Sequence, residues 1–453
     1  MSLARAALLG TVATMVIATA PAPSFAEGPT SAETARATAE PARAAPGSAA
    51  ASDLAELSTV GKPAWTQTWG AAQAAAVPNV TSGFAGFTIR NAVHTSVPGN
   101  KVRVHLSNRL GTLPVLMGHV TVSISARTGG KADGSVQYSN GSVAPGTMHD
   151  VLFAGRPSVT IPAGAEVVSD AVALAVPADQ DLYVTVFTPK PSGTVTYHPA
   201  TMQTNTYFDD GTDHAADIAP SGFPKETYVW HYVSGVDVSG GPGTVVAIGD
   251  SITDGVNSSW AANRRWTDYL ATRLRGQKKV PRYGVSNAAI SGNRILLDGA
   301  YPNYTIYETT GKSALARLGY DVLDRPGART VIVFEGINDI QQEPHQADPE
   351  QIIAGLAQLA QQAHDRGLRV VGATIMAWNG WYSYTPQLEA TRQAVNSWIR
   401  TSKTFQAVAD FDAATRDPAD QSRILPAFDS GDHLHPNDAG DAAIAAAVPL
   451  KKL

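Results

Sequence analysis

The sequence predicts two folded regions, an all-β region followed by an α/β region that is built on a parallel sheet. Short alternating runs such as KVRVHLSNRLG (residues 101–111) and LYVTVFTP (residues 182–189), separated by Gly and Pro turns, are typical of a β-sandwich or jelly roll. After residue 243, apolar strands alternate with amphipathic helices. That alternation predicts a parallel sheet with helices on both faces.

The composition limits the classes of partner. The 453 residues carry a formal net charge of −5, which favours neither nucleic acid nor an anionic membrane as a partner. The chain has no cysteine, and this excludes disulfide bonds, thiolate catalysis and a cysteine-ligated zinc site. Apolar residues make up 43% of the chain, which is enough for one large or two moderate hydrophobic cores.

Residues 1–26 have the pattern of a secretory signal peptide. Arg5 precedes an apolar run from Ala6 to Ala20, and Ser24-Phe25-Ala26 forms a small-x-small cleavage site. The run is shorter than the ~20 apolar residues of a membrane span, and no later segment is long and apolar enough to cross a bilayer. We therefore expect a secreted protein without stable membrane insertion. Residues 27–62, rich in Ala, Pro, Thr, Ser and Glu, predict a disordered linker.

The β region is expected over residues 63–238, where the strand pattern begins at Trp65. SGGPG (residues 239–243) is interpreted as a hinge into the α/β region, residues 244–453. Buried strands are predicted there near Val285 and at four apolar runs: Val245–Ile248, TVIVFEG (330–336), RVVGATIM (369–376) and FQAVADF (405–411).

Helices are predicted between these strands. One carries Trp266, Tyr269, Leu270 and Leu274 at helical spacing. Two more are expected to begin at Asp348-Pro349 and Thr385-Pro386, because an Asp or Thr cap followed by Pro is a helix start signal. Gly367 is expected to follow the end of the first of these two helices. In such sheets, ligands bind at the carboxyl ends of the strands.

Ser251, in TVVAIGDSITDG (residues 244–255), lies where such a site belongs. Gly249 allows a tight turn after the strand, and the helix that follows offers unpaired N–H groups and a positive dipole. The alternative is that Ser251 is only a helix cap. Asp254 is interpreted as a favourable charge in the first turn of the helix, and Asp250 as a residue that holds the serine loop.

The C-terminal stretch DSGDHLHPNDAG (residues 429–440) supplies the base that a serine nucleophile needs. Such a base is usually a histidine held by a carboxylate, and Asp432 and His435 are three residues apart, within one turn of chain. His433 is the rival base. One other interpretation is a polar surface loop. Another is a metal-binding loop built from Asp429, Asp432, His433, His435 and Asp438. A run of ligands this dense in sequence does not by itself provide the coordination geometry that a metal ion requires.

Two further segments contribute polar groups at strand ends. EGINDI (residues 335–340) follows a strand and places Asn338 at the same end of the sheet as Ser251, where its amide can donate to a developing oxyanion. Gly292, in NAAISGNRIL (residues 287–296), can present a backbone N–H where a side chain would obstruct. The alternative interpretations are a turn residue for Asn338 and a strand-exit glycine for Gly292.

Together and in this order, GDSITDG, ISGN, GIND and DHLHP resemble the sequence blocks of the GDSL-type SGNH hydrolase family. The resemblance spans about Thr244 to the C-terminus, with Ile252 where the eponymous motif has leucine. Three longer stretches look like those of the secreted subgroup with an N-terminal β domain: VIVFEGINDI, RGLRVVGATIMAW and SGDHLHPNDAG. The resemblance implies a three-layer α/β/α domain behind a β-sandwich. The G-x-S-x-G elbow of other α/β-hydrolases is absent.

The resemblance also implies a role for each residue. Ser251 would attack an ester carbonyl, and His435 would remove its proton and later protonate the leaving alcohol. Asp432 would orient His435. The backbone N–H groups of Ser251 and Gly292 and the amide of Asn338 would bind the oxyanion. Water would then release the acyl group, with no metal or other cofactor.

The leading prediction is a secreted carboxylic ester hydrolase that acts on a small-molecule, lipid or polysaccharide ester. In WNGWYSYTP (residues 378–386), Trp378, Trp381 and Tyr382 are expected to line an acyl pocket or stack on a sugar, with loop packing as the alternative. An acyltransferase that uses the same site is the second function considered. A glycan-binding protein with an idle hydrolase domain is the third, and the intact set of four polar site residues argues against it.

Overall fold

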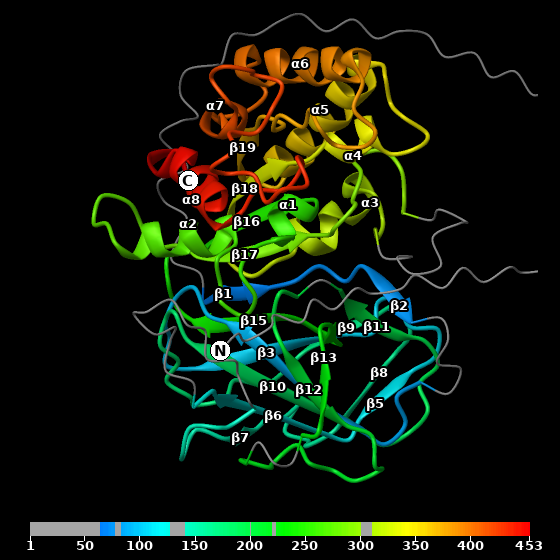
Figure 1. Ribbon diagram of the computed structural model, residues 1–453. Coiled ribbons are helices and arrows are strands. Elements are labelled where there is room, and N and C mark those ends of the chain that lie inside the picture. The colour runs from blue at the N-terminus through cyan, green and yellow to red at the C-terminus, as the bar shows by residue number, and fades with distance from the viewer. Residues whose placement is uncertain (1–63, 78–82, 127–140, 200, 220–222, 300–309) are drawn as a thin grey trace, which may run out of the picture. The chain divides into compact units, whose positions relative to one another are not determined.

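The computed structural model describes residues 64–77, 83–126, 141–199, 201–219, 223–299 and 310–453 (Figure 1). The predicted signal peptide and linker, residues 1–62, lie outside the described residues, so both stay predictions. Within the described ranges, no helix combines the length and the apolarity that crossing a membrane requires.

Five parallel strands form the sheet of the α/β region, in the order β17-β16-β18-β19-β20. Their bounds are β16 Thr244–Gly249, β17 Gly284–Ala289, β18 Ala328–Phe334, β19 Arg369–Ala373 and β20 Ala407–Ala409. The chain passes from β16 to β17 on one side and then to β18 on the other side, so the strand order reverses at β16. Ligands bind at the carboxyl ends of parallel strands at such a reversal, and Ser251 follows β16 there.

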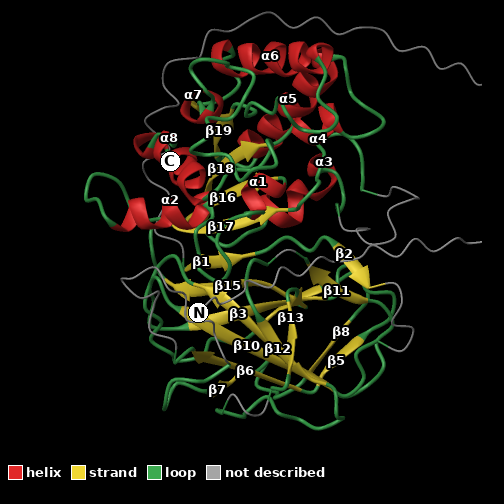
Figure 2. Ribbon diagram, in the orientation of Figure 1, coloured by secondary structure: helices red, strands yellow, loops and turns green. Residues whose placement is uncertain are grey.

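Helices cover both faces of this sheet, which confirms the predicted three-layer α/β/α fold (Figure 2). Successive residues of a strand point to opposite faces. Val246 and Ile248 therefore pack with the apolar faces of α3, α5 and α6, while Val245 and Ala247 pack with α2, α7 and α8. The helices are α1 Ser251–Asp254, α2 Trp266–Arg275, α3 Ala314–Leu318, α4 Ile337–Gln341, α5 Pro349–Asp365, α6 Pro386–Thr401, α7 Phe411–Thr415 and α8 Asp438–Ala447.

Helix starts follow the predicted caps. The side chain of Asp348 accepts a hydrogen bond from the N–H of Glu350 at the start of α5, and that of Thr385 accepts one from Leu388 at the start of α6. The last strand is shorter than the run FQAVADF predicts. Asp410 ends it, because its carboxylate caps α7 by accepting from the N–H of Ala413.

The N-terminal region consists largely of antiparallel β-sheets, as predicted. Its two larger sheets, ordered β1-β15-β4-β9 and β13-β12-β3-β10-β6-β7, share one apolar core, which makes the region a sandwich. The strands are β1 Trp65–Gly70, β2 Ala75–Val77, β3 Phe87–His94, β4 Val102–Ser107, β5 Val115–Met117, β6 His119–Ile124, β7 His149–Asp150, β8 Val159–Ile161, β9 Glu166–Val168, β10 Asp181–Thr188, β11 Val195–His198, β12 Asn205–Phe208, β13 Lys225–Thr227, β14 Trp230–His231 and β15 Val233–Ser239.

Direct polar contacts join the β region to the α/β region. The N–H of Gln67 in β1 donates to Thr244 Oγ1 in β16 at 2.9 Å, and the N–H of Val285 in β17 donates to Ser96 Oγ at 2.9 Å. A Cβ at Gly284 would collide with the carbonyl oxygen of Gln67, so the backbones lie too close for any larger residue. The predicted hinge, residues 239–243, therefore connects two regions that pack against each other.

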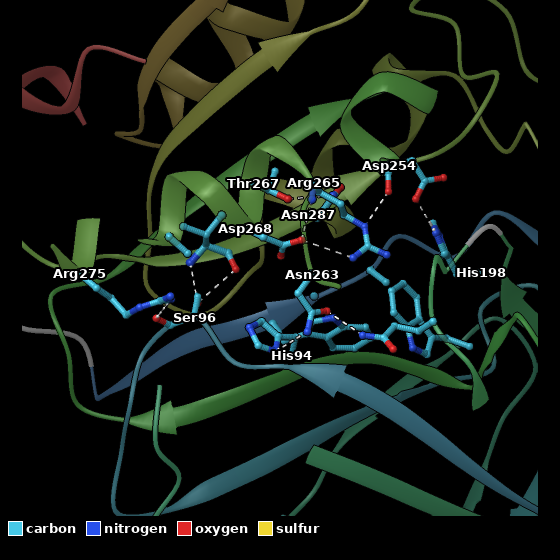
Figure 3. Close-up of a pocket in the computed structure, with 17 residues that line it drawn as sticks. His94, Ser96, His198, Asp254, Asn263, Arg265, Thr267, Asp268, Arg275 and Asn287 are labelled. Atoms are coloured by element: carbon cyan, nitrogen blue, oxygen red, sulfur yellow. Dashed lines mark hydrogen bonds and ion pairs between the residues drawn. The ribbon is translucent and has the colours of Figure 1, made fainter. Parts of the chain in front are cut away.

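His94 forms part of this contact. Its ring nitrogens lie 2.7 Å from Asp181 Oδ1 and 3.2 Å from Asp179 Oδ1, and Asn263 of the α/β region approaches it at 2.9 Å (Figure 3). Burial disfavours the charged ring, but the hydrogen bonds to the two carboxylates outweigh this and raise the pKa of His94 to about 9.

The raised pKa predicts a pH-dependent contribution to stability. A group whose pKa is higher in the folded state stabilises the fold fully below its unfolded pKa and ceases to do so as the pH rises through the folded value. The melting temperature of His94→Gln should therefore lie furthest below that of the wild type near pH 6, about the ordinary histidine pKa, and the difference should shrink as the pH approaches about 9. A difference that stays constant over this range would contradict the assignment.

Candidate active site

Ser251 is the first residue of α1, directly after the carboxyl end of β16. The helix cap is its neighbour Asp250, whose Oδ1 accepts a hydrogen bond from the N–H of Ile252 at 2.9 Å. The Ser251 hydroxyl is therefore not occupied in capping. Gly249 makes the tight turn possible, since a Cβ there would collide with the side chain of Thr253.

The hydroxyl of Ser251 instead faces His435. Ser251 Oγ lies 2.8 Å from His435 Nε2, and His435 Nδ1 lies 2.7 Å from Asp432 Oδ2. Ser251 follows β16, whereas Asp432 and His435 lie in the segment before α8. Ser251 and His435 are 184 residues apart in sequence. The structure thus brings together the three residues that the sequence predicts to act as nucleophile, base and orienting acid.

Asp432 is held as a carboxylate. Burial opposes its ionisation, but the hydrogen bond to the His435 side chain and the backbone N–H bonds from His435 and Leu434 outweigh burial and keep the pKa of Asp432 below its usual range. A carboxylate can only accept, so Nδ1 of His435 carries the proton. Nε2 is then free to accept the hydroxyl proton of Ser251.

Asn257 contacts Asp432, and the sequence did not predict this contact. Its Nδ2 donates to Asp432 Oδ2 and to Ser430 Oγ, each at 2.9 Å, and its backbone has a φ of +68°. Asparagine tolerates this left-handed conformation better than most residues. Nothing in the local pattern around position 257 distinguishes it from an ordinary turn asparagine.

His433, the rival base, lies apart from Ser251. Its Nδ1 pairs with Asp429 Oδ2 at 2.6 Å, and its side chain is 47% exposed. Asp438 instead accepts hydrogen bonds from Ser259 and Arg264. The acidic and histidine side chains of this loop therefore form separate pairs, with Asp432 on His435 and Asp429 on His433.

The predicted oxyanion donors lie on two adjoining turns. Gly292, after β17, has a φ of +78°, and a Cβ there would collide with Thr310. Asn338, in α4, donates from Nδ2 to the carbonyl oxygen of Asn293 at 3.0 Å. Gln342 Nε2 donates to both the Gly292 carbonyl oxygen, at 3.1 Å, and Asn338 Oδ1, at 2.9 Å. The two turns thus hold each other in place.

The orientation of the Asn338 amide follows from the donor and acceptor groups of its neighbours Trp381 and Gln341. An indole N–H can only donate, so the contact of Trp381 Nε1 with Gln341 at 2.9 Å must be to Oε1. The NH₂ end of Gln341 then faces Asn338 and donates to its Oδ1 at 2.7 Å. The NH₂ group of Asn338 is consequently turned toward Asn293, where one hydrogen is used. The second hydrogen can be offered to a ligand.

Of the three predicted substrate-contacting aromatic residues, Trp381 lies beside the histidine and Tyr382 packs against Trp381. The ring of Trp381 is edge-on to that of His435, with centroids 6.0 Å apart, and Tyr382, 76% exposed, lies 4.9 Å from Trp381. Trp378 is fully buried in the core, and its Nε1 donates to Glu389 Oε2 at 3.0 Å. Trp378 therefore has packing contacts and no surface to offer to a substrate in this structure.

Several buried ionisable side chains lie close to the serine turn. Burial raises the pKa of Asp250 to about 7 and raises that of Glu335 well above its ordinary value. Arg317 lies among these groups: it pairs with Glu335 at 3.3 Å and donates to the carbonyl oxygens of Gly249 and Ala288. Arg317 therefore fixes the carboxyl ends of β16 and β17 relative to each other.

The variant Trp381→Phe tests whether the hydrogen bond from Trp381 to Gln341 orients the Asn338 amide. The variant keeps an aromatic ring beside His435 but removes the N–H that orients Gln341, while the weaker donor Ser383 Oγ, 3.3 Å from Gln341, remains. A hydrogen bond of this kind contributes roughly 0.5–1.5 kcal/mol, so kcat should fall about two- to tenfold. The matched control Trp378→Phe loses an indole N–H in the core; it should lower the melting temperature and leave kcat unchanged. Equal kcat losses in both variants would contradict the proposed orientation.

Comparison with known proteins places these residues in a family. Residues 247–443 match the model of the GDSL-like Lipase/Acylhydrolase family. No curated protein matches the chain. Among solved structures, a protein of the G-D-S-L family from Desulfitobacterium hafniense is 19% identical, with 46% of this chain and 99% of that chain covered and a TM-score of 0.35.

Two further similar structures are esterases. An acetylxylan esterase from Geobacillus stearothermophilus is 21% identical, with 46% of this chain and 92% of that chain covered and a TM-score of 0.34. The aryl esterase of M. smegmatis is 17% identical, with 46% of this chain and 96% of that chain covered and a TM-score of 0.36.

The match to a lipase and acylhydrolase family covers the α/β region of this protein and supports carboxylic ester hydrolysis as the activity of that region. The α/β region is a domain of the GDSL-like lipase/acylhydrolase family, preceded by a β region that the family model does not cover. The family resemblance predicted from the four sequence blocks is thereby confirmed.

Proposed function

We propose that this protein hydrolyses esters through an acyl-enzyme intermediate on Ser251. The observation that supports this proposal most directly is the continuous line of hydrogen bonds from Ser251 Oγ through His435 to Asp432, at 2.8 and 2.7 Å. A serine hydroxyl becomes a competent nucleophile only when a base can take its proton, and this arrangement provides one.

In the proposed reaction, Ser251 Oγ attacks the carbonyl carbon while His435 Nε2 accepts the hydroxyl proton. The C–O bond to the alcohol then breaks, and His435 returns the proton to the leaving oxygen. Water attacks the acyl-enzyme in the same way, with His435 again as base, and releases the acid and free Ser251. Asp432 stays ionised throughout and stabilises the imidazolium that forms in each half-reaction.

The negative charge that develops on the carbonyl oxygen requires donors. We assign this role to the backbone N–H groups of Ser251 and Gly292 and to the second N–H of the Asn338 amide. Such donors act mainly in the transition state, because negative charge grows on the carbonyl oxygen only as the tetrahedral species forms. The hydrogen bonds from Gln341 and Gln342 to Asn338 Oδ1 support this role, since they fix the amide before substrate binds.

For the substrate, we propose an acylated polysaccharide. Trp381 and Tyr382 present an aromatic surface next to His435, and Tyr382 is largely exposed. Aromatic faces of this kind suit a sugar ring on the alcohol side of the ester. Secretion, which the pattern of residues 1–26 predicts, would place the enzyme where such polymers occur.

A panel of esters tests the proposal. Hydrolysis of p-nitrophenyl esters from acetate to dodecanoate and release of acetate from acetylated xylan should be measured with a Ser251→Ala preparation as the blank. We expect activity on acetate esters and on xylan. Tyr382→Ala should lower kcat/KM on acetylated xylan several-fold and leave p-nitrophenyl acetate hydrolysis nearly unchanged.

The same panel separates the alternatives. A rate that rises steadily with acyl chain length, with no release from xylan, would indicate a lipid esterase. Transfer of the acyl group to an added alcohol in preference to water would indicate an acyltransferase. No turnover of any ester above the blank would reject the ester-hydrolysing role of this site.

A further inference from the structure

His198, the last residue of β11 in the β region, reaches into the α/β region. Its Nε2 lies 3.0 Å from Asp254 Oδ1 (Figure 3). Its Nδ1 lies 2.7 Å from the carbonyl oxygen of Ala72. The side chains of His198 and Asp254 are only 2% and 3% exposed. Asp254, which the sequence suggests is a simple first-turn helix charge, is therefore a buried link between the two regions.

The second carboxylate oxygen of Asp254 holds the turn that carries Gly292. Asp254 Oδ2 accepts hydrogen bonds from the N–H of Ser291 at 3.1 Å and from its Oγ at 2.6 Å. Ser291 directly precedes Gly292. Asp254 is also the last residue of α1, the four-residue helix that begins at Ser251. One buried carboxylate thus ties the nucleophile's helix to the turn of the proposed oxyanion donor.

The chemistry of the pair explains why a histidine is suited to this position. Both ring nitrogens of His198 face oxygen acceptors, so a doubly protonated ring satisfies both contacts, whereas either neutral tautomer satisfies only one. A buried carboxylate is costly unless it is paired and hydrogen-bonded. Nε2 of His198 supplies that partner for Asp254, while Arg265 Nε donates only to the backbone carbonyl oxygen of Asp254.

A small cavity beside the pair is separate from the proposed active site. It has a volume of about 40 Å³ and is lined by His198, Asp254 and Arg265 among others, with neither Ser251 nor His435 in its wall (Figure 3). A space of this size accommodates water and is too small for a sugar or an acyl chain. His198 therefore acts on the site through Asp254, without contacting a substrate.

We propose that His198 is a positioning residue for ester hydrolysis: through Asp254 it fixes the Ser291–Gly292 turn and directs the Gly292 N–H toward the oxyanion. This inference rests on the proposed function of Gly292 as an oxyanion donor. It also gives the β region a direct part in the reaction, because the residue that holds the turn comes from β11.

His198→Ala should lower kcat on p-nitrophenyl acetate. A displacement of about 1 Å in a catalytic group can cost on the order of 10²-fold, so we expect a loss of about 10- to 100-fold with KM changed less than about twofold. His198→Gln, whose amide can still donate to Asp254, should recover part of the loss. The matched control is His231→Ala, a buried histidine on the adjacent strand β14 that pairs with Tyr197 of β11. It should lower stability and leave kcat near the wild-type value.

Hydrogen exchange gives a readout that does not depend on activity. The amide of Ser291 is protected by Asp254, so the peptide containing Ser291 and Gly292 should exchange faster in His198→Ala than in the wild type or in His231→Ala. All proteins should be compared well below their melting temperatures. If His198→Ala does not fold, His198→Gln against His231→Ala provides the same comparison.

The outcomes separate the two proposals. A wild type without esterase activity would reject the proposed function, while faster exchange at Ser291 in His198→Ala would still support the structural link. An active wild type with an unchanged kcat in His198→Ala, an equal kcat loss in His231→Ala, or unaltered exchange at Ser291 would each overturn the positioning role.

Discussion

Ser251→Ala and His435→Ala are each expected to lower kcat by up to about 10⁶-fold, because nucleophile and base act as one unit and removing either one disables both. The 2.8 Å contact between Ser251 Oγ and His435 Nε2 is the structural reason. The double variant should be no worse than either single variant. Steady-state rates on p-nitrophenyl acetate, with melting temperatures to show that each variant is folded, measure this directly.

His433→Ala is the matched control for the histidine. It removes the same side chain two residues away, where the ring pairs with Asp429 and does not reach Ser251. Its kcat should stay within a few-fold of the wild type. If His433→Ala were the more damaging change, the assignment of His435 as base would be wrong. If both variants retained full activity, neither histidine would be the base.

Asn338→Ala is expected to lower kcat by about 10²–10³-fold, corresponding to roughly 2.7–4 kcal/mol for one oxyanion donor. KM should change little, because the donor acts mainly in the transition state. Asn338→Asp should be at least as damaging, since the carboxylate would repel both the oxyanion and the carbonyl oxygen of Asn293 that the amide now contacts. Both kinetic constants and the melting temperature should be measured for each variant.

The alternative role for Asn338 predicts the opposite pattern. If the residue only stabilises the turn through Asn293, Gln341 and Gln342, its loss should lower the melting temperature and leave kcat near normal in the folded protein. A normal kcat in Asn338→Ala would remove Asn338 from the reaction.

The fold and the central site residues could be predicted because their signals are local. Alternating patterns identify strands, and the Asp348 and Thr385 caps mark helix starts within a few residues of sequence. The carboxyl ends of parallel strands share one edge of a sheet, so the sequence alone predicts that Ser251 and Asn338 lie at the same edge. The three-residue spacing of Asp432 and His435 likewise fits within one turn of chain.

The remaining contacts depend on packing between distant segments. Trp378 and Trp381 are three residues apart in one aromatic loop, and only the structure shows that the first is buried against Glu389 and the second lies beside His435. Asn257 reaches Asp432 across 175 residues, and His198 reaches Asp254 from the other region of the protein. No periodicity or spacing in the sequence encodes these contacts.

The proposal that Ser251 forms an acyl-enzyme is tested most directly by covalent labelling. The protein should be treated with a serine-directed fluorophosphonate, digested and analysed by mass spectrometry, with loss of activity followed in parallel. We predict one adduct, on the peptide that contains Ser251, formed in proportion to inactivation, absent in Ser251→Ala and formed far more slowly in His435→Ala. An adduct on a different residue, or complete inactivation while Ser251 stays unmodified, would contradict the mechanism.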